Sequence, residues 1–492
     1  MSVGPSQVDM FSARRRAAGI VASRFFTRRF DRRSTLGLAF LLLVLIAQGV
    51  AVAQSDLWAV PLLCLLLVAV APDLPLIPLL GLLLLVRVLT DDLASSNSRH
   101  SSSVNLSAAI AGLYILVAIG LLLHRRRASW QVILTTLWLC VWTAVAVKTN
   151  GASTLTVREG VRETSIVALA VIVFNSRGVL NISLVTRMVQ MVGVAAAVVA
   201  LYQLATHGGQ SVGGEMRANG TFSQPNSAAV FFAVATMVSV WRFIDGGRQR
   251  SDAIFTTLYA VATISTFSLG GLACLLVMLI TFGLLRPGSA RLKLGSCAVA
   301  ALIVAVFLAT PLGAERVASE SSTNLTTSGQ RGGSGTSLGW RFFKWGTLIP
   351  EWEQSPIFGR GLGTTITSEG NANTQVTGVP PHNEPLRYLV ETGIFGLLTL
   401  FAAVIFLLRR LARQRRIPGD HETATLGIAI VVGMLINGVG ANTLLYTPAA
   451  YVAAMVVAAV LGAGHDASSP SREYTQPLRP TNLRLDAAID TR

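Results

Sequence analysis

The residues best suited to chemistry stand in residues 382–396, HNEPLRYLVETGIFG, where the polar stretch 311–384 leads into an apolar run. His382 and Asn383 precede the apolar run, whereas Arg387 and Glu391 lie inside it, four residues apart and therefore on one helical face. A charged residue at the centre of a bilayer costs about 2.5–3.5 kcal/mol on insertion scales. Two of them predict a polar pocket rather than a lipid-facing surface, and hence a site at this junction.

Two further segments carry cations or glycines. Arg341 and Lys344 stand three residues apart in LGWRFFKWGTLIPEW, which predicts a short helix at the membrane surface with the two cations on one face. Residues 355–363, SPIFGRGLG, contain a G-x-G-x-G pattern. No strand precedes this pattern, so we interpret it as a tight loop rather than a phosphate-binding fingerprint.

The elements that position these residues are predicted to be membrane helices. Of the 492 residues, 52% are hydrophobic and 13% are charged, whereas a soluble domain carries about 25% charged residues. We predict an all-α fold, a polytopic transmembrane helical bundle of about 14 spans (12–14), with one large extracytoplasmic loop carrying short helices. The apolar runs lie at 36–53, 57–71, 74–90, 106–123, 131–147, 164–176, 185–206, 226–242, 253–267, 269–285, 295–310, 385–408, 423–440 and 444–463.

The orientation follows from the positions of the basic residues. With the N-terminus inside, fourteen spans place every Lys and Arg cluster in the cytoplasm, as the positive-inside rule requires. The net charge of +16 is then explained by topology and anionic headgroups, and we expect no nucleic-acid partner. The predicted parts are a cytoplasmic basic N-terminal tail (1–35), transmembrane helices 1–11 (36–310), the extracytoplasmic loop (311–384), transmembrane helices 12–14 (385–463) and a cytoplasmic C-terminal tail (464–492).

The cysteines indicate neither a disulfide framework nor a metal site. All four fall within apolar runs at unrelated spacings, so we interpret them as small core residues: Cys64, Cys140, Cys274 and Cys297. Residues 51–53, Ala-Val-Ala, resemble a signal-peptidase site. The preceding apolar run is longer than in a usual signal peptide, which favours a first helix that is not cleaved.

These motifs together resemble the O-antigen ligase and O-antigen polymerase superfamily of polytopic glycosyltransferases. The resemblance covers residues 216–440 and includes a departure, because this chain has Ser268-Leu269-Gly270 where many relatives have Ser-Arg-Gly. The residues that carry the resemblance are Arg217, Gly220 and Asn226, then Arg341 and Trp345, then Pro356, Gly359, Gly361 and Gly363, and finally His382, Asn383, Glu391, Gly393, Ile394 and Gly396.

The resemblance implies transfer of a glycan from a polyprenyl-pyrophosphate carrier, such as undecaprenyl pyrophosphate, to an acceptor hydroxyl outside the cytoplasmic membrane. It implies no metal and no cofactor. Partners would be the carrier-linked donor, a glycan, lipid or protein acceptor, and membrane lipids. Arginine suits a departing pyrophosphate because its guanidinium stays charged and matches phosphate oxygens, so Arg217 and Arg341 are the candidates for that role. His382 is the candidate general base. Further candidates for substrate binding are Lys344, Asn383, Arg387, Glu391 and Asn226.

Other classes remain open at this point. An acidic-residue, metal-assisted lipid-phosphate-sugar glycosyltransferase would place its chemistry at Asp56 or at Asp91 and Asp92. A polysaccharide or lipid transporter would show repeated halves with interrupted helices. Within the resembling superfamily, the motifs do not separate a ligase from a polymerase.

The topology gives a first prediction. A reporter fused after Gly370 is expected to register outside the cytoplasm and one fused after Arg413 inside, because the span count and the basic clusters agree on this orientation. Paired periplasmic and cytoplasmic reporters measure both positions. A cytoplasmic signal from the Gly370 fusion would contradict the prediction, since the site would then face away from its substrate.

Overall fold

The structure is a computed structural model, and it describes residues 76–92, 106–125, 141–142, 144–145, 154–212, 215–245, 249–288, 290–321, 337–367 and 380–468. Two of the predicted spans, 36–53 and 57–71, and most of 131–147 lie outside these residues.

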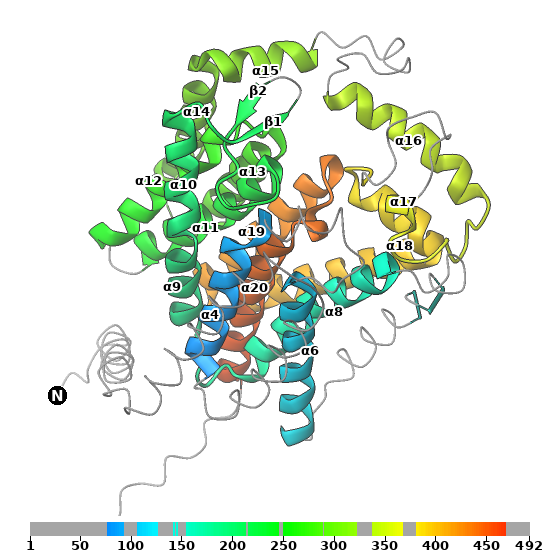
Figure 1. Ribbon diagram of the computed structural model, residues 1–492. Coiled ribbons are helices and arrows are strands. Elements are labelled where there is room, and N and C mark those ends of the chain that lie inside the picture. Colours follow the sequence, from blue (N-terminus) through cyan, green and yellow to red (C-terminus); the bar gives the residue numbers. More distant parts are fainter. Residues whose placement is uncertain are drawn as a thin grey trace, which may run out of the picture.

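The described part is an assembly of helices with one small hairpin (Figure 1). In chain order its elements are α4 (Leu76–Leu89), α6 (Leu106–Arg125), α8 (Thr154–Asn175), α9 (Ile182–Val192), α10 (Val194–Ala205), β1 (Gln210–Val212), β2 (Glu215–Arg217), α11 (Pro225–Asp245), α12 (Arg250–Ser265), α13 (Leu269–Leu285), α14 (Ala290–Ala309), α15 (Pro311–Ser321), α16 (Ser337–Glu353), α17 (Thr364–Thr367), α18 (Glu384–Gln414), α19 (His421–Gly440), η1 (Thr443–Leu445) and α20 (Thr447–Ser468).

The core is built around α11. Its sequence is apolar on every side, as is typical of a helix buried within a bundle, and α12, α13, α19 and α20 pack around it. The aromatic rings of Phe222, Phe231 and Phe232 lie within 5.1–5.9 Å of one another at its start. Because α11 follows directly on the β hairpin and its turn, this packing also anchors the polar segment that begins at Arg217.

Apolar helices of membrane-spanning length confirm the predicted class. Within the described residues, five helices are long and apolar enough to cross a membrane, and a sixth candidate is a pair, Lys293–Ala309 and Pro311–Ala318, bent by 92°. The five are Ile182–Ala205, Pro225–Asp245, Glu384–Gln414, His421–Gly440 and Thr447–Gly464. The protein is therefore a helical membrane protein, and the count of about 14 spans stays a prediction.

One predicted boundary differs from the structure by ten residues. The predicted span 164–176 corresponds to α8, which begins ten residues earlier, at Thr154. The added turns carry three charged residues. Glu159 and Arg162 pair with each other, and Glu163 pairs with Arg387 of α18. Charged residues thus continue the helix where hydropathy predicts a loop.

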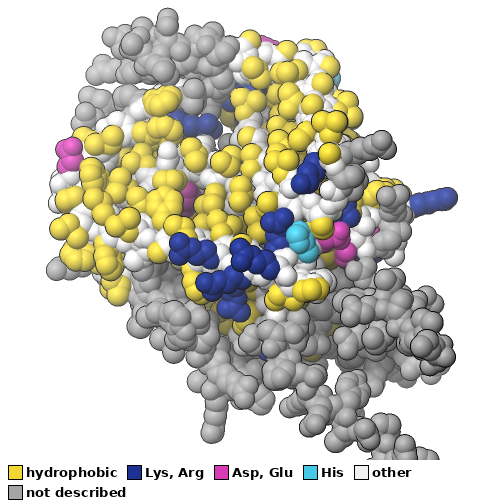
Figure 2. Space-filling view, turned by 180° about the vertical axis from the view of Figure 1, so that it is seen from behind, with side chains coloured by type: hydrophobic (Ala, Val, Ile, Leu, Met, Phe, Trp, Pro, Cys, Tyr) yellow, Lys and Arg dark blue, Asp and Glu magenta, His cyan; other side chains and the backbone are white. Residues whose placement is uncertain are grey.

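Basic residues gather at one end of the helices. Figure 2 shows Lys and Arg side chains in a band across the otherwise apolar back surface. Arg286, at the end of α13, pairs with Glu422 of α19 at 2.9 Å, and Arg415, at the end of α18, donates to the Leu285 carbonyl at 2.5 Å. Two clusters predicted to face the cytoplasm therefore lie side by side.

The helix α18 is broken at Gly393, whose backbone angles are φ 67° and ψ −174°. The loop 355–363, here called the glycine loop, pairs with the peptide groups on both sides of the break. Its amides at Arg360 and Gly361 donate to the carbonyls of residues 390 and 391 at 2.9 and 2.7 Å, and its carbonyl at Pro356 accepts from the Ile394 amide at 2.9 Å. The loop thus satisfies backbone groups that the break exposes.

Backbone contact explains two glycines, Gly359 of this loop and Gly393 of α18. A Cβ at Gly359 would lie 2.4 Å from the Thr392 nitrogen, and a Cβ at Gly393 would lie 2.2 Å from the Ile357 carbonyl oxygen. Both glycines also have φ of 67°, in the left-handed region that favours glycine. Close packing of two backbones therefore accounts for Gly359, the first glycine of the G-x-G-x-G pattern.

The break in α18 generates a second prediction. Gly393→Ala is expected to lower the free energy of unfolding by about 2 kcal/mol or more, because its backbone region is accessible essentially to glycine alone. Denaturant unfolding in detergent measures the change. Gly346→Ala in α16 is the control, since a Cβ there meets no atom within 4 Å. A Gly393→Ala protein as stable as the Gly346→Ala protein would contradict this account of the break.

Candidate functional site

His382 lies in the short segment that connects the glycine-loop side of the protein to α18. Its backbone has φ 51°, in the left-handed region that non-glycine residues rarely occupy, and such strain is concentrated at functional sites. The next residue, Asn383, caps α18 by accepting from the Leu386 amide at 2.8 Å. The Trp345 indole of α16 donates to the Pro381 carbonyl at 2.7 Å. Cap and indole together fix the imidazole between α16 and α18.

Arg341 of α16 acts directly on this histidine. Burial, together with the smaller effect of the positive charge of Arg341, lowers the pKa of His382 to about 4. The imidazole is therefore neutral near pH 7. A neutral imidazole can accept a proton, and a guanidinium next to it can hold an anion.

Arg217, the last residue of β2, lies in a second polar cluster at the start of α11 and α13. Its Nε donates to the Thr266 carbonyl at 2.8 Å and its Nη2 donates to Asn226 Oδ1 at 3.2 Å. The same Asn226 oxygen accepts from Ser268 Oγ at 2.8 Å. Ser268 also caps α13, by accepting from the Gly271 amide at 3.2 Å. At the point where the chain departs from Ser-Arg-Gly, the serine thus orders the amide that contacts Arg217.

The turn between Arg217 and Asn226 is fixed by side chains from two other helices. Gln203 Oε1 of α10 accepts from the Asn219 and Gly220 amides at 3.0 and 2.8 Å. Asp91 accepts from the Ser223 amide and hydroxyl at 3.0 and 2.9 Å and pairs with Arg87 at 2.6 Å. Asp91, one of the three residues that the metal-assisted alternative named, therefore has a structural role in holding this turn.

Tyr446, which the sequence analysis did not identify, lies close to both clusters. Burial raises the pKa of its phenol to about 12, while Arg341, Asn226 and Arg217 each act to lower that pKa. All three residues must therefore lie near the phenol. The predicted span 444–463 placed this tyrosine inside a helix, whereas the structure places it in the turn before α20. Its apolar neighbours gave no signal of a polar environment.

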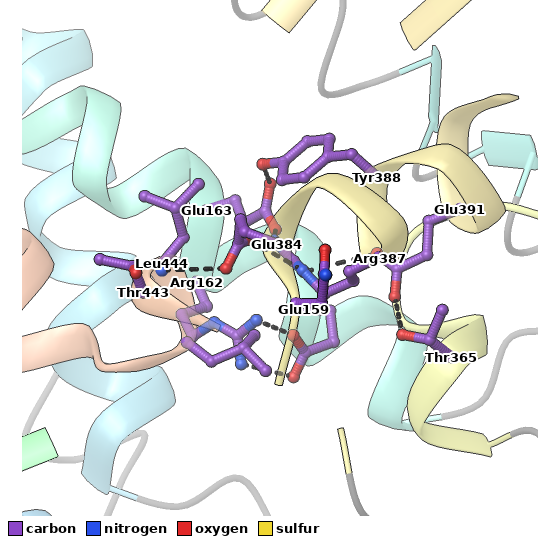
Figure 3. Close-up of polar contacts among 12 residues, drawn as sticks. Glu159, Arg162, Glu163, Thr365, Glu384, Arg387, Tyr388, Glu391, Thr443 and Leu444 are labelled. Carbon is purple, nitrogen blue, oxygen red and sulfur yellow. Dashed lines mark hydrogen bonds and ion pairs between the residues drawn. The ribbon is translucent and has the colours of Figure 1, made fainter. Parts of the chain in front are cut away.

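A buried ion cluster lies at the first turns of α18, directly after His382 in the chain (Figure 3). Arg387 Nη2 pairs with Glu163 of α8 at 2.7 Å, its Nε donates to Glu384 at 2.9 Å, and its Nη1 pairs with Glu391 at 3.4 Å. All four side chains are buried. The predicted contact between Arg387 and Glu391 on one helical face is thus present, and it belongs to a larger cluster.

Neighbouring groups complete the cluster. Tyr388 donates to the second oxygen of Glu163 at 2.7 Å, and Thr365 of α17 donates to Glu391 at 2.5 Å. The Leu444 amide of η1 donates to Glu384 at 3.4 Å. The cluster therefore ties α8, α17 and η1 to the first turns of α18. Glu163 and Glu384 are residues that sequence reasoning missed, because their partner becomes apparent only when α8 lies against α18.

Lys344 interacts with another acidic residue, Glu351. Lys344 is buried in α16, and burial lowers its pKa while Glu351 of the same helix raises it. Glu351 in turn pairs with Arg360 of the glycine loop at 3.1 Å. The structure thus places Arg341 beside His382 and Lys344 beside Glu351, and a substrate-binding role for Lys344 stays a prediction.

Comparison with known proteins agrees with the resemblance. Residues 254–401 match the family model described as O-antigen ligase. None of the curated proteins compared with the chain matches it. The matched stretch includes Arg341, His382 and the first part of α18, while Arg217 and Asn226 precede it. The resemblance to the O-antigen ligase superfamily is confirmed over this stretch, and the match supports a likeness to membrane glycosyltransferase-like ligases and polymerases.

The environment of His382 generates a third prediction. The folded protein binds the imidazole proton less tightly than the unfolded chain, because its pKa is about 4 when folded and 6.5 ordinarily. As the pH falls from 6.5 towards 4, the unfolded state takes up the proton first. The free energy of unfolding is therefore expected to fall, by up to about 3 kcal/mol.

Denaturant unfolding of the parent and of His382→Gln, each at about pH 7 and pH 4.5, isolates this contribution from those of other groups. The parent is expected to lose more stability than the variant on acidification. Equal losses in the two proteins would show that His382 titrates normally.

Proposed function

We propose that the protein transfers a glycan from a polyprenyl-pyrophosphate carrier, undecaprenyl pyrophosphate in the expected case, to an acceptor hydroxyl on the outer side of the cytoplasmic membrane. The observation that carries the proposal is the neutral imidazole of His382 beside Arg341. The second arginine, Arg217, is brought into the same site because both arginines act on the buried phenol of Tyr446. The reaction needs a proton acceptor for the hydroxyl and fixed cations for the departing pyrophosphate.

In the proposed reaction, the acceptor oxygen attacks the anomeric carbon of the donor sugar and forms the new glycosidic bond. The bond between that carbon and the phosphate oxygen breaks, and polyprenyl pyrophosphate leaves with the bonding electron pair. Arg217 and Arg341 stabilise the charge that develops on the leaving group, which is the type of interaction that contributes most to catalysis. His382 accepts the hydroxyl proton and later releases it to solvent.

Donor binding would also tune the base. Arg341 lowers the pKa of His382 in the unliganded protein. A pyrophosphate paired with Arg341 would offset that positive charge and raise the proton affinity of the imidazole. The histidine would then become a stronger base once the donor is in place.

The other predicted substrate-binding residues take different places in this proposal. Asn226 touches Arg217 directly and would orient it towards the donor. Asn383, Arg387 and Glu391 would act through the position of His382, because Asn383 caps α18 and the other two lie in the buried ion cluster. The acceptor class separates a ligase from a polymerase, and both fit this chemistry.

The proposal gives a fourth prediction, because a base and a phosphate clamp fail in different ways. His382→Ala is expected to lose transfer by about 10²- to 10⁴-fold while donor binding is retained. Arg217→Ala and Arg341→Ala are expected to weaken donor binding as well as turnover. Lysine at either position is expected to restore only part of the donor binding and turnover, because it lacks the planar guanidinium that pairs with two phosphate oxygens.

Donor binding and single-turnover transfer on purified protein measure the two effects separately. Arg250→Ala, at an exposed position of α12, is the matched arginine control. Each variant is first compared with the parent in yield and melting temperature. Parental transfer by well-folded His382→Ala, or parental donor binding by both arginine variants, would refute the assigned roles.

A further inference from the structure

The turn between α19 and α20 carries two buried polar side chains that the mechanism has not used. Asn442 has no exposed surface, and Tyr446 is 2% exposed. Among the described residues, no group lies within hydrogen-bonding geometry of the Asn442 carboxamide, and none accepts the Tyr446 hydroxyl proton, although the Asn226 side chain interacts with that hydroxyl and lowers its pKa. A buried polar group without a hydrogen bond costs about 1–3 kcal/mol, so two of them in one turn indicate a functional requirement.

The turn itself is well fixed. Asn437 Nδ2 of α19 donates to Thr443 Oγ1 at 2.9 Å, and the Leu444 amide donates to Glu384 at 3.4 Å. The Tyr446 amide donates to the Thr443 carbonyl at 3.2 Å. The backbone of the turn is therefore held by α18 and α19, and its two unused side chains are buried.

The charges around the turn indicate the ligand. Arg341 and Arg217 both act on the Tyr446 phenol, and a Cβ at Gly440 would lie 4.0 Å from Arg341 Nη1. The Asn226 oxygen near the phenol already accepts from Arg217 and Ser268. A phenol proton without an acceptor, placed between two guanidinium groups, matches an anion with several acceptor oxygens.

Resting on the proposed function, we propose that Tyr446 and Asn442 complete a subsite for the pyrophosphate of the carrier-linked donor. The Tyr446 hydroxyl donates to one non-bridging oxygen and the Asn442 amide to another, while Arg217 and Arg341 supply the positive charge. The donor reaches them from the side of α16, because Arg341 and His382 are partly exposed whereas Arg217, Asn442 and Tyr446 are buried behind them.

Two neutral donors besides two arginines favour a ligand with two phosphates over a ligand with one. The subsite would therefore discriminate polyprenyl pyrophosphate, the product of transfer, from polyprenyl monophosphate. A tyrosine that merely filled space would weaken the two ligands to the same extent. The ratio of the two affinities thus separates contact with the ligand from a packing role.

The test uses the full chain in detergent, with polyprenyl pyrophosphate and polyprenyl monophosphate, both without glycan, as the probes. Tyr446→Phe removes one hydroxyl and is expected to weaken pyrophosphate binding by about 10- to 100-fold, the usual value of a hydrogen bond to a charged group. Monophosphate binding is expected to weaken less. Asn442→Asp keeps the shape of the side chain and adds a negative charge, so it is expected to weaken pyrophosphate binding more strongly than Tyr446→Phe.

Tyr451→Phe is the matched control, because Tyr451 is a buried tyrosine of α20 whose hydroxyl is bonded to Ser165 Oγ at 2.6 Å. It is expected to bind both probes as the parent does. Parental pyrophosphate binding by folded Tyr446→Phe and Asn442→Asp, with loss in the two arginine variants, would overturn the subsite and leave the proposed function standing. A parent that binds neither probe would overturn the proposed function itself.

Discussion

The site depends on the burial of one arginine among three carboxylates. Arg387 has no exposed surface and pairs with Glu163, Glu384 and Glu391, which come from α8 and from the first turns of α18. Burying a charge is costly, and it is tolerated only where partners compensate it fully. Removal of Arg387 would leave three buried carboxylates without their cation, so the helices that supply these residues have to stay together.

The ion cluster also positions the reacting groups, because its members stand close to them in the chain. Glu384 follows His382 by two residues and accepts from the Leu444 amide, while Tyr446 follows Leu444 by two residues. The same carboxylate thus sets the histidine segment against the turn between α19 and α20. A site made of loops needs such contacts between segments that are distant in the chain, because loop residues alone hold a site's geometry less well than residues on rigid elements.

Local patterns in the sequence predict part of this arrangement. The helix predicted over 269–285 has those bounds in α13, because a capping serine precedes the apolar run and Arg286 follows it. The contact between Arg387 and Glu391 follows from a spacing of four residues. Glu163 could not be predicted as their partner, since it stands 224 residues before Arg387 and only tertiary packing brings it there. Tyr446 could not be predicted as a site residue for another reason. In a membrane protein, a tyrosine next to leucines resembles the end of a span, and the polar neighbours of Tyr446 come from four other segments.

The break in α18 has a mechanical consequence. The segment that carries His382, Arg387 and Glu391 lies before Gly393 and is tied to α8. The glycine loop holds the backbone on both sides of the break, up to residue 395, and residues 396–414 extend beyond it to the basic end of the bundle. A continuous helix would transmit any change of its tilt along its whole length. Membranes of different thickness change the tilt of spanning helices. With the helix broken at Gly393 and the break held by the glycine loop, residues 396–414 can follow the bilayer while the residues around His382 keep the alignment set by the protein interior.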